Sequence, residues 1–237
     1  MTRSGLFKVL FAAALLPPLA GCWSAYYDAR TFFASGNFAS KEQLATLGVP
    51  GMPEPGSPAD RADMAAVLDW QAKRTPEQCE AAKAQARAGY EVFFGDLYPL
   101  PDDPAAAEFI DKVRDDVWLA MGLLKSKYDR PRPYSRDKAV KPCLRRPGGL
   151  AYPSGHAALA RAYALILSEV APARRAEFLA RADQAALNRV IGGVHHPSDI
   201  EAGKLLAEAL YEEALADPEF RRGLDAMRAR PGRPAGQ

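Results

Sequence analysis

Three short clusters of polar residues in the second half of the chain have the types and spacing that could act on a bound anion. They are Lys125-x6-Arg132-Pro133, then Pro153-Ser154-Gly155-His156, then Arg189-x5-His195-x3-Asp199. Each is expected where a loop meets a helix, so the side chains can converge without belonging to a core stripe. Singly, a basic pair, a capped helix start and an ion-paired helix end would be ordinary surface features. Together they hold three cations and span all three histidines of the chain.

The combination has what is needed to bind a dianion. Lys125, Arg132 and Arg189 can neutralise two negative charges, and the arginine forks match the geometry of phosphate oxygens. A helix that begins at Ser154 and Gly155 would add free backbone N–H groups and the positive end of its dipole. Gly155 also lets that backbone approach a ligand closely. A histidine beside such a site is suited to act as nucleophile or acid near neutral pH.

Two of the histidines, His195 and His196, are adjacent. They lie four and three residues before Asp199, and both could reach its carboxylate near a helix start. Spacing alone therefore leaves open which of the two would do chemistry.

Helices must carry these clusters, because apolar residues recur at helical spacing and no stretch shows the alternation of a strand. The expected helices cover residues 60–70, 75–94, 103–123, 154–170, 172–190 and a last one from 197 onward. The Pro, Gly and Arg residues of 128–152 predict a long loop. We therefore expect an all-α fold, with a single helical-bundle domain over residues 61–237.

The bulk composition is that of an ordinary globular domain. The chain has 237 residues, 48% of them hydrophobic and 25% charged, with a formal net charge of +2. So small a charge predicts no nucleic-acid partner. The sequence contains no carboxylate-rich or histidine-rich ligand motif, so neither a metal nor another cofactor is expected. A homo-oligomer is left open.

The N-terminus has the layout of a secretory signal. "MTRSGLFKVLFAAALLPPLAGC" places basic residues before a short apolar run and ends in Leu-Ala-Gly-Cys, which resembles the lipobox of bacterial lipoproteins. We expect residues 1–21 to be removed and Cys22 to be acylated. The protein would then be tethered in the bacterial cell envelope on the periplasmic side, at the outer rather than the inner membrane. A plain signal peptide with a chance cysteine is the alternative.

Two further features follow from the sequence beyond the signal. Residues 22–60 are rich in Pro and Gly, look irregular, and predict a tether or a surface-wrapping arm. Once Cys22 is acylated, Cys79 and Cys143 form an even pair in an oxidising compartment. A disulfide and two free buried thiols are both compatible with the sequence.

In order and spacing the three clusters resemble the signature K-x6-RP, PSGH, SR-x5-H-x3-D of the phosphatidic-acid-phosphatase type 2 (PAP2) superfamily, which includes bacterial class A nonspecific acid phosphatases and vanadium haloperoxidases. A looser likeness to the class A enzymes includes "YPLP" upstream and "AYPSGHAALARAYALILSEVAP". The resemblance implies an all-helical fold and an exported, metal-independent acid phosphatase acting on phosphate monoesters. One position differs from the family signature: Asn188 stands where the family has serine.

The resemblance also implies roles. His195 would attack phosphorus to form a phosphohistidine, while Asp199 accepts its other ring N–H. His156 would protonate the leaving alkoxide and then activate water. The phosphoryl oxygens would be held by the remaining cluster residues, Lys125, Arg132, Ser154, Gly155 and Arg189. His195 must then be neutral and His156 protonated, which predicts a bell-shaped pH profile on the acid side of neutral. In this register His196 packs beside the site or touches the substrate.

Three other functions are compatible with the same site. A lipid phosphate phosphatase would act at the membrane surface, and a vanadium-dependent haloperoxidase would hold vanadate at His195. A non-catalytic anion-binding surface lipoprotein would leave the histidines and the aspartate without a task.

Overall fold

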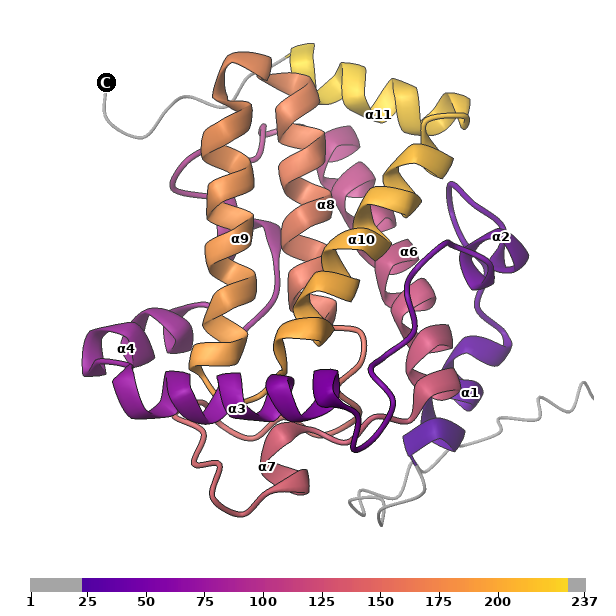
Figure 1. Ribbon diagram of the computed structural model, residues 1–237. Helices are drawn as coiled ribbons and strands as arrows, with labels where there is room; N and C mark the ends of the chain where they lie inside the picture. The colour runs from indigo at the N-terminus through magenta and orange to yellow at the C-terminus, as the bar shows by residue number, and fades with distance from the viewer. Residues whose placement is uncertain (1–22, 230–237) are drawn as a thin grey trace, which may run out of the picture.

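The computed structural model describes residues 23–229, and every regular element among them is helical (Figure 1). This confirms the predicted all-α fold. The helices are α1 (Trp23–Phe32), α2 (Lys41–Ala45), α3 (Pro58–Lys73), α4 (Pro76–Ala84), α5 (Tyr90–Phe94), α6 (Pro104–Tyr128), α7 (Pro133–Arg136), α8 (Gly155–Val170), α9 (Arg175–Ile191), α10 (Pro197–Ala214) and α11 (Pro218–Ala229), with a 3₁₀ turn, η1, at Pro172–Arg174. None of the described helices is both long and apolar enough to cross a bilayer. The expected signal segment and Cys22 lie outside the described residues.

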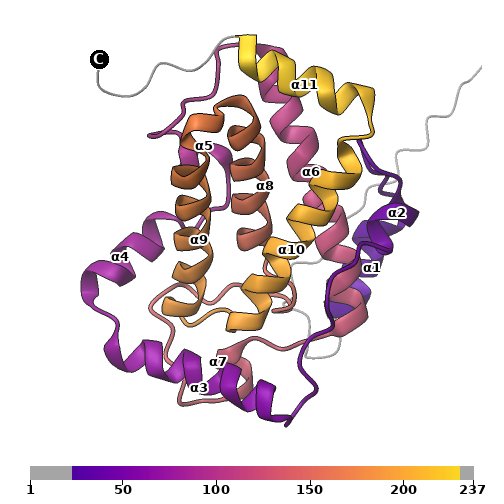
Figure 2. The ribbon, with the colours of Figure 1, turned by 45° about the horizontal axis from the view of Figure 1, so that its top comes forward.

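Helix α8 lies at the centre of the bundle and packs against α6, α9 and α10 (Figures 1 and 2). Its residues are buried on nearly every face, as a helix surrounded by helices requires. Small residues let the partners come close. A Cβ on Gly203 of α10 would lie 2.4 Å from the Ser154 carbonyl oxygen, so only glycine allows α10 to cross the start of α8 here.

Local signals start the helices where the sequence predicts. The Ser154 side chain caps α8 by accepting from the Ala157 N–H, and Pro197 is the first residue of α10. Helices α8 and α10 begin, and α6 and α9 end, at the same end of the bundle, with α3 lying across it (Figure 1). All three polar clusters therefore meet at this end.

The prediction that residues 23–60 are irregular is wrong in part. Helix α1 forms there and packs along α6, with Tyr27 and Thr31 against Gly122. The rest of the segment wraps the bundle, since the buried Asp116 carboxylate of α6 accepts from the backbone N–H groups of Asn37 and Phe38 at 2.6 and 2.9 Å. Long-range packing decides the placement of α1 and of the backbone at Asn37 and Phe38, and the local sequence does not signal it. Helix α2, in contrast, begins at a local capping box formed by Ser40 and Gln43.

The helix expected over residues 75–94 is in fact two helices, α4 and α5, separated by residues 85–89. Gly89 disfavours helix continuation, and the separating segment makes contacts that a continuous helix could not. The Gln85 side chain accepts from Asn188, and the Ala86 carbonyl lies 3.0 Å from a ring nitrogen of His156. Helix α7 also interrupts the loop expected over 128–152, and α11 has no counterpart among the expected helices.

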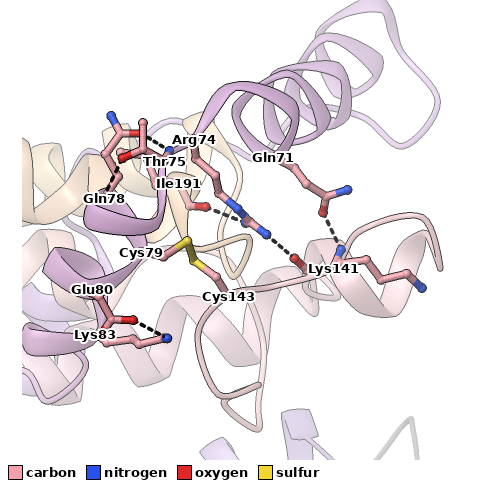
Figure 3. The surroundings of a disulfide bond; sticks show 10 residues. All are labelled: Gln71, Arg74, Thr75, Gln78, Cys79, Glu80, Lys83, Lys141, Cys143 and Ile191. Carbon is pink, nitrogen blue, oxygen red and sulfur yellow. Dashed lines mark hydrogen bonds and ion pairs between the residues drawn. A yellow bond between two sulfur atoms is a disulfide. The ribbon is translucent and has the colours of Figure 1, made fainter.

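A disulfide joins Cys79 of α4 to Cys143, 64 residues along the chain (Figure 3). Beside it, Arg74 donates to the carbonyls of Ile191 at 2.8 Å and Lys141 at 2.5 Å. These bonds hold the segment before Pro153 against α4 and the end of α9, which helps to fix one wall of the site.

Candidate active site

The structure brings the three clusters together in a buried site. Lys125 comes from the last turns of α6, Arg189 from the last turn of α9 and Asp199 from the first turn of α10, and all three are buried. The Ser154 N–H donates to the Asp199 carbonyl at 2.9 Å, which ties the start of α8 to the start of α10.

Two of the cations hold the backbone that leads into α8. The Lys125 ammonium donates to the carbonyls of Leu150 and Pro153 at 2.6 and 2.8 Å. The Arg132 guanidinium donates to the Gly149 carbonyl at 3.1 Å and to the Val194 carbonyl at 3.0 Å. Burial lowers the pKa of both side chains, and the charge of Arg132 lowers the pKa of Lys125 further, because like charges oppose each other.

Arg189 differs from these two. Its side chain is 4% exposed, and its Nε and Nη1 have no hydrogen-bond partner within residues 23–229. Burial, and then the charge of Arg132, lower its pKa to about 9. A buried guanidinium with idle donors is costly unless an anion accepts from it, so this residue points to an anion site.

The first turn of α8 adds donors on the same side. An α-helix leaves its first backbone N–H groups without intrahelical acceptors, and in α8 these belong to Gly155 and His156. Ser154 is fully buried. The helix start therefore offers two backbone N–H groups from which an anion could accept.

His195 is held in the state that a nucleophile requires. Its Nδ1 donates to Asp199 Oδ2 at 3.3 Å, and its Nε2 accepts from Arg132 Nη1 at 3.1 Å. Burial and the neighbouring Arg132 hold the pKa of His195 well below its usual range, against the opposing effect of Asp199. The ring is thus neutral, and its Nε2 carries a lone pair that accepts from Arg132.

His196 contacts the same carboxylate but faces elsewhere. Its Nδ1 lies 2.9 Å from Asp199 Oδ2, and its backbone N–H donates to that oxygen at 2.7 Å. Its Nε2 accepts from Arg136 at 3.0 Å, and the ring has no exposed surface. Both rings contact Asp199, so the two histidines differ only in the arginine that each Nε2 faces. The arginine at His196 is Arg136, which in turn donates to Asp60, outside the anion site.

His156 lies at the start of α8 with its Nε2 3.0 Å from the Ala86 carbonyl, to which it donates. Burial, followed by the charge of Arg189, lowers its pKa to about 3. The ring is therefore neutral in the free site at pH values above that. An anion bound beside Arg189 would offset the second of these two causes.

Sequence reasoning missed a buried ion cluster behind Asp199, centred on Arg130. Arg130 Nη1 donates to Asp199 Oδ1 at 2.6 Å, and its Nη2 donates to Asp60 at 3.1 Å and Asp63 at 2.8 Å. All four side chains are buried. The Ser198 hydroxyl accepts from Arg130 Nη1 at 2.7 Å. The only sequence signal for this cluster was the spacing of Asp60 and Asp63, three residues apart on α3. Two carboxylates at that spacing usually face solvent, so the spacing does not predict a buried cluster.

Asn188, the one residue that differs from the PAP2 signature, makes its side-chain hydrogen bonds to residues other than the three site cations. Its Nδ2 donates to Gln85 Oε1 at 2.8 Å, and its Oδ1 accepts from Gln184 at 2.8 Å. Asn188 thereby holds the 85–89 segment that carries the Ala86 partner of His156. Within the described part of the chain, no group of three or more His, Cys, Asp or Glu side chains is arranged to hold a metal.

Comparison with known proteins gives consistent matches. The family model of the PAP2 superfamily matches residues 116–214. A non-specific acid phosphatase of Providencia stuartii is 30% identical over 203 residues, which cover 79% of this chain and 80% of that protein. A non-specific acid phosphatase of Salmonella typhimurium is 32% identical over 117 residues, or 47% of this chain and 46% of that one.

Solved structures show the same fold at low identity. A bacterial vanadium-dependent chloroperoxidase superposes with a TM-score of 0.61 at 12% identity, over 82% of this chain and 55% of that one. A transmembrane PAP2-type phosphatidylglycerolphosphate phosphatase from Bacillus subtilis gives 0.52 at 17% identity, over 82% of this chain and 95% of that one. The chain thus spans about half the length of the haloperoxidase that it matches.

Proposed function

Since this chain belongs to the PAP2 superfamily and is homologous over most of its length to a bacterial acid phosphatase, it is an enzyme of the phosphatase class, and we propose that it hydrolyses phosphate monoesters through a phosphohistidine at His195. The observation that carries the proposal is the buried Arg189 guanidinium with idle donors, beside Arg132 and the start of α8. This arrangement fits a tetrahedral dianion.

Binding prepares the nucleophile. In the free site Arg132 Nη1 occupies the Nε2 lone pair of His195. A phosphoryl oxygen is a stronger acceptor for Arg132 than a neutral ring nitrogen, so the bound dianion takes this donor and releases Nε2 to face phosphorus. Arg189 and the N–H groups of Gly155 and His156 hold the other oxygens as charge shifts among them.

The transfer proceeds in two balanced steps. In the first, the Nε2 lone pair of His195 forms the N–P bond, the P–O bond to the alcohol breaks, and the leaving oxygen takes a proton from His156. In the second, neutral His156 takes a proton from water, the water oxygen attacks phosphorus, and the N–P bond breaks to release inorganic phosphate. Asp199 stabilises the positive charge on the His195 ring throughout, because Arg130 fixes its other oxygen.

The location of the enzyme is part of the proposal. Export and acylation at Cys22 would place the anchor directly before α1, whose Trp23 lies against Gly148, next to the backbone that Arg132 holds. A lipid-anchored chain would therefore keep Trp23 and this backbone segment close to the bilayer. Mass spectrometry of the protein from bacterial membranes should find acyl groups on Cys22, and an unmodified, unprocessed N-terminus would rule this out. Light scattering of the purified protein would measure whether it is a homo-oligomer.

The test of the activity uses one protein and three reactions. The purified chain should release phosphate from p-nitrophenyl phosphate with EDTA present. Preference for phosphatidic acid in mixed micelles by about tenfold in kcat/KM would favour a lipid phosphate phosphatase instead. Failure to release phosphate from any ester, together with dye bromination in the presence of vanadate and peroxide, would favour the haloperoxidase and refute the proposal.

A further inference from the structure

Residues 85–89, the segment between α4 and α5, contact the proposed proton donor. The Ala86 carbonyl lies 3.0 Å from Nε2 of His156, and the ring nitrogen must donate because a carbonyl only accepts. The uncharged ring of Phe93 from α5 stands edge-on to the same imidazole, with the ring centres 6.1 Å apart. The position of the 85–89 backbone therefore decides how His156 is held.

Asn188 ties this segment to α9. Its Nδ2 donates to Oε1 of Gln85 at 2.8 Å, and its Oδ1 accepts from Gln184 at 2.8 Å, which fixes the orientation of the amide. Asn188 is buried, so water competes little for these bonds. In the part of the chain that the structure describes, residues 85–89 make two hydrogen bonds to α8 and α9, the one from Asn188 and the one from His156.

The bond to Gln85 needs an asparagine at position 188. The serine of the family signature carries its hydroxyl two covalent bonds from Cα, whereas Nδ2 of asparagine is three bonds away. A serine is therefore too short to reach Gln85 from the same backbone. The one position at which this chain differs from the signature is thus the position that holds the 85–89 segment.

The groups around His156 act on its charge in opposite directions. Burial and then the charge of Arg189 lower its pKa, and Arg132 lowers it further. The carbonyls of Ala86 and Gln85 raise it, because they accept from the protonated ring. If residues 85–89 move away, the groups that favour protonation are lost, while both arginines remain.

The contact with Ala86 also selects the nitrogen that exchanges the proton. In the neutral ring of His156, Nε2 keeps its hydrogen on this carbonyl, so Nδ1 carries the lone pair. A proton that the ring takes up is bound at Nδ1 and leaves from Nδ1 to the alcohol oxygen. The Nε2–H bond stays intact throughout.

We propose that Asn188 is a positioning residue for proton transfer: through Gln85 it holds the 85–89 backbone against His156 and so keeps this imidazole in the orientation and tautomer that the transfer needs. Asn188 acts through these residues and is not itself a catalytic residue. The inference rests on the proposed phosphatase function, which gives His156 the role of acid and base.

The test compares two esters whose leaving groups need a proton to different degrees. p-Nitrophenolate leaves readily without one, whereas the alkoxide of glycerol 3-phosphate must be protonated as the P–O bond breaks. In Asn188→Ala, kcat/KM should fall about 100-fold with glycerol 3-phosphate, the cost of a misplaced catalytic group, and less than about tenfold with p-nitrophenyl phosphate. The basic limb of the pH profile of kcat should move to lower pH, because the lost carbonyls favour the protonated ring of His156.

Variants of Gln85 separate this effect from damage to Arg189, the neighbour of Asn188 in the chain. Gln85→Ala should reproduce both changes, and the double variant Gln85→Ala, Asn188→Ala should be no worse than either single one, because both remove the same bond. Gln85→Glu keeps an acceptor for Asn188 and should retain most of the activity with glycerol 3-phosphate.

Asn37→Ala is the matched control. Asn37 also donates through Nδ2, to the Lys112 carbonyl at 3.3 Å and to Asp116 at 2.9 Å, and these residues belong to none of the three clusters. Its removal should leave the ratio of kcat/KM for the two esters and the pH profile unchanged.

Equal losses with both esters in Asn188→Ala, or a basic limb that stays in place, would overturn the proposal, because a merely structural defect slows both reactions alike. Nitrogen NMR of the histidine rings at neutral pH gives a readout that needs no turnover. The His156 ring should carry its hydrogen on Nε2 in the wild type and lose this fixed tautomer in Asn188→Ala. If the ring responds in this way but no ester is hydrolysed, the proposed function fails and the positioning stands. A ring that is unchanged in Asn188→Ala refutes the positioning, whatever the activity.

Discussion

Replacing Arg130 by methionine should destabilise the protein far more than removal of any exposed arginine. Arg130 is 3% exposed and donates to Asp60, Asp63 and Asp199 at 2.6 to 3.1 Å. Methionine keeps the unbranched stem of the side chain, without the guanidinium, and leaves three buried carboxylates without their shared cation. Breaking a buried ion pair from one side costs about 3–5 kcal/mol.

The carboxylates keep other partners, so the cost should not multiply by three. Asp60 still accepts from Arg136, Asp63 from Ser198, and Asp199 from both histidines. At about 2–4 °C per kcal/mol for a domain of this size, the melting temperature should fall by about 6–20 °C. Catalysis should fall as well, because an unfixed Asp199 no longer orients His195, and a misplacement of about 1 Å can cost about 100-fold. KM should change little, since Arg130 lies behind Asp199.

The assay is urea unfolding followed by steady-state kinetics at a temperature where the variant is folded. Arg228→Met is the matched control, because Arg228 also pairs with two carboxylates, Glu169 and Asp225, but is exposed. It should cost less than about 1 kcal/mol. Arg130→Lys should restore part of kcat by restoring the charge without the fork. If Arg130→Met matches Arg228→Met in stability and the wild type in kcat, the buried cluster does not position Asp199.

Three further predictions concern protons and the disulfide. Burial raises the pKa of Asp60, but hydrogen bonds from Arg136 and others outweigh burial and lower the pKa to about 2 from 3.8. The resulting stabilisation of about 2 kcal/mol is present above pH 4 and is lost as the pH falls from 4 to 2. In Asp60→Asn the free energy of unfolding should therefore depend less steeply on pH over that interval, and an unchanged slope would contradict the pairing. The pKa of His156, about 3 in the free site because of burial and Arg189, should rise by at least about two units when vanadate binds, as followed by NMR of the ring; a pKa that stays near 3 would remove its role as proton donor. Reducing the bond between Cys79 and Cys143, which closes a loop of 64 residues, should lower the unfolding free energy by about 4 kcal/mol, and a Cys79→Ser, Cys143→Ser double variant should behave alike with or without reductant.

Features with local causes were predictable from the sequence. The Ser154 cap and Pro197 mark helix starts that the structure shows at those residues, because capping and the fixed φ of proline act within one turn. The three motifs were recognisable because their spacing is short within each one. Their convergence at one end of the bundle follows from the direction of four helices.

Features that depend on distant partners were not predictable. Helix α1 exists because its aromatic side chains pack against α6, about 90 residues along the chain. The Arg130 cluster joins residues 67 to 70 positions apart, and no local pattern encodes such pairing. His195 and His196 were indistinguishable by spacing, and the difference between them lies in the arginine that each Nε2 faces.

The most direct test of the mechanism is the kcat of His195→Ala measured beside that of His196→Ala, with p-nitrophenyl phosphate and with folding checked by circular dichroism. His195→Ala should lose at least about 1,000-fold, because the nucleophile is gone. His196→Ala should keep most of its activity, with a loss of about tenfold or less from the weaker support of Asp199. Full activity in His195→Ala, or a folded His196→Ala that is as inactive as His195→Ala, would contradict the assignment of His195 as the nucleophile.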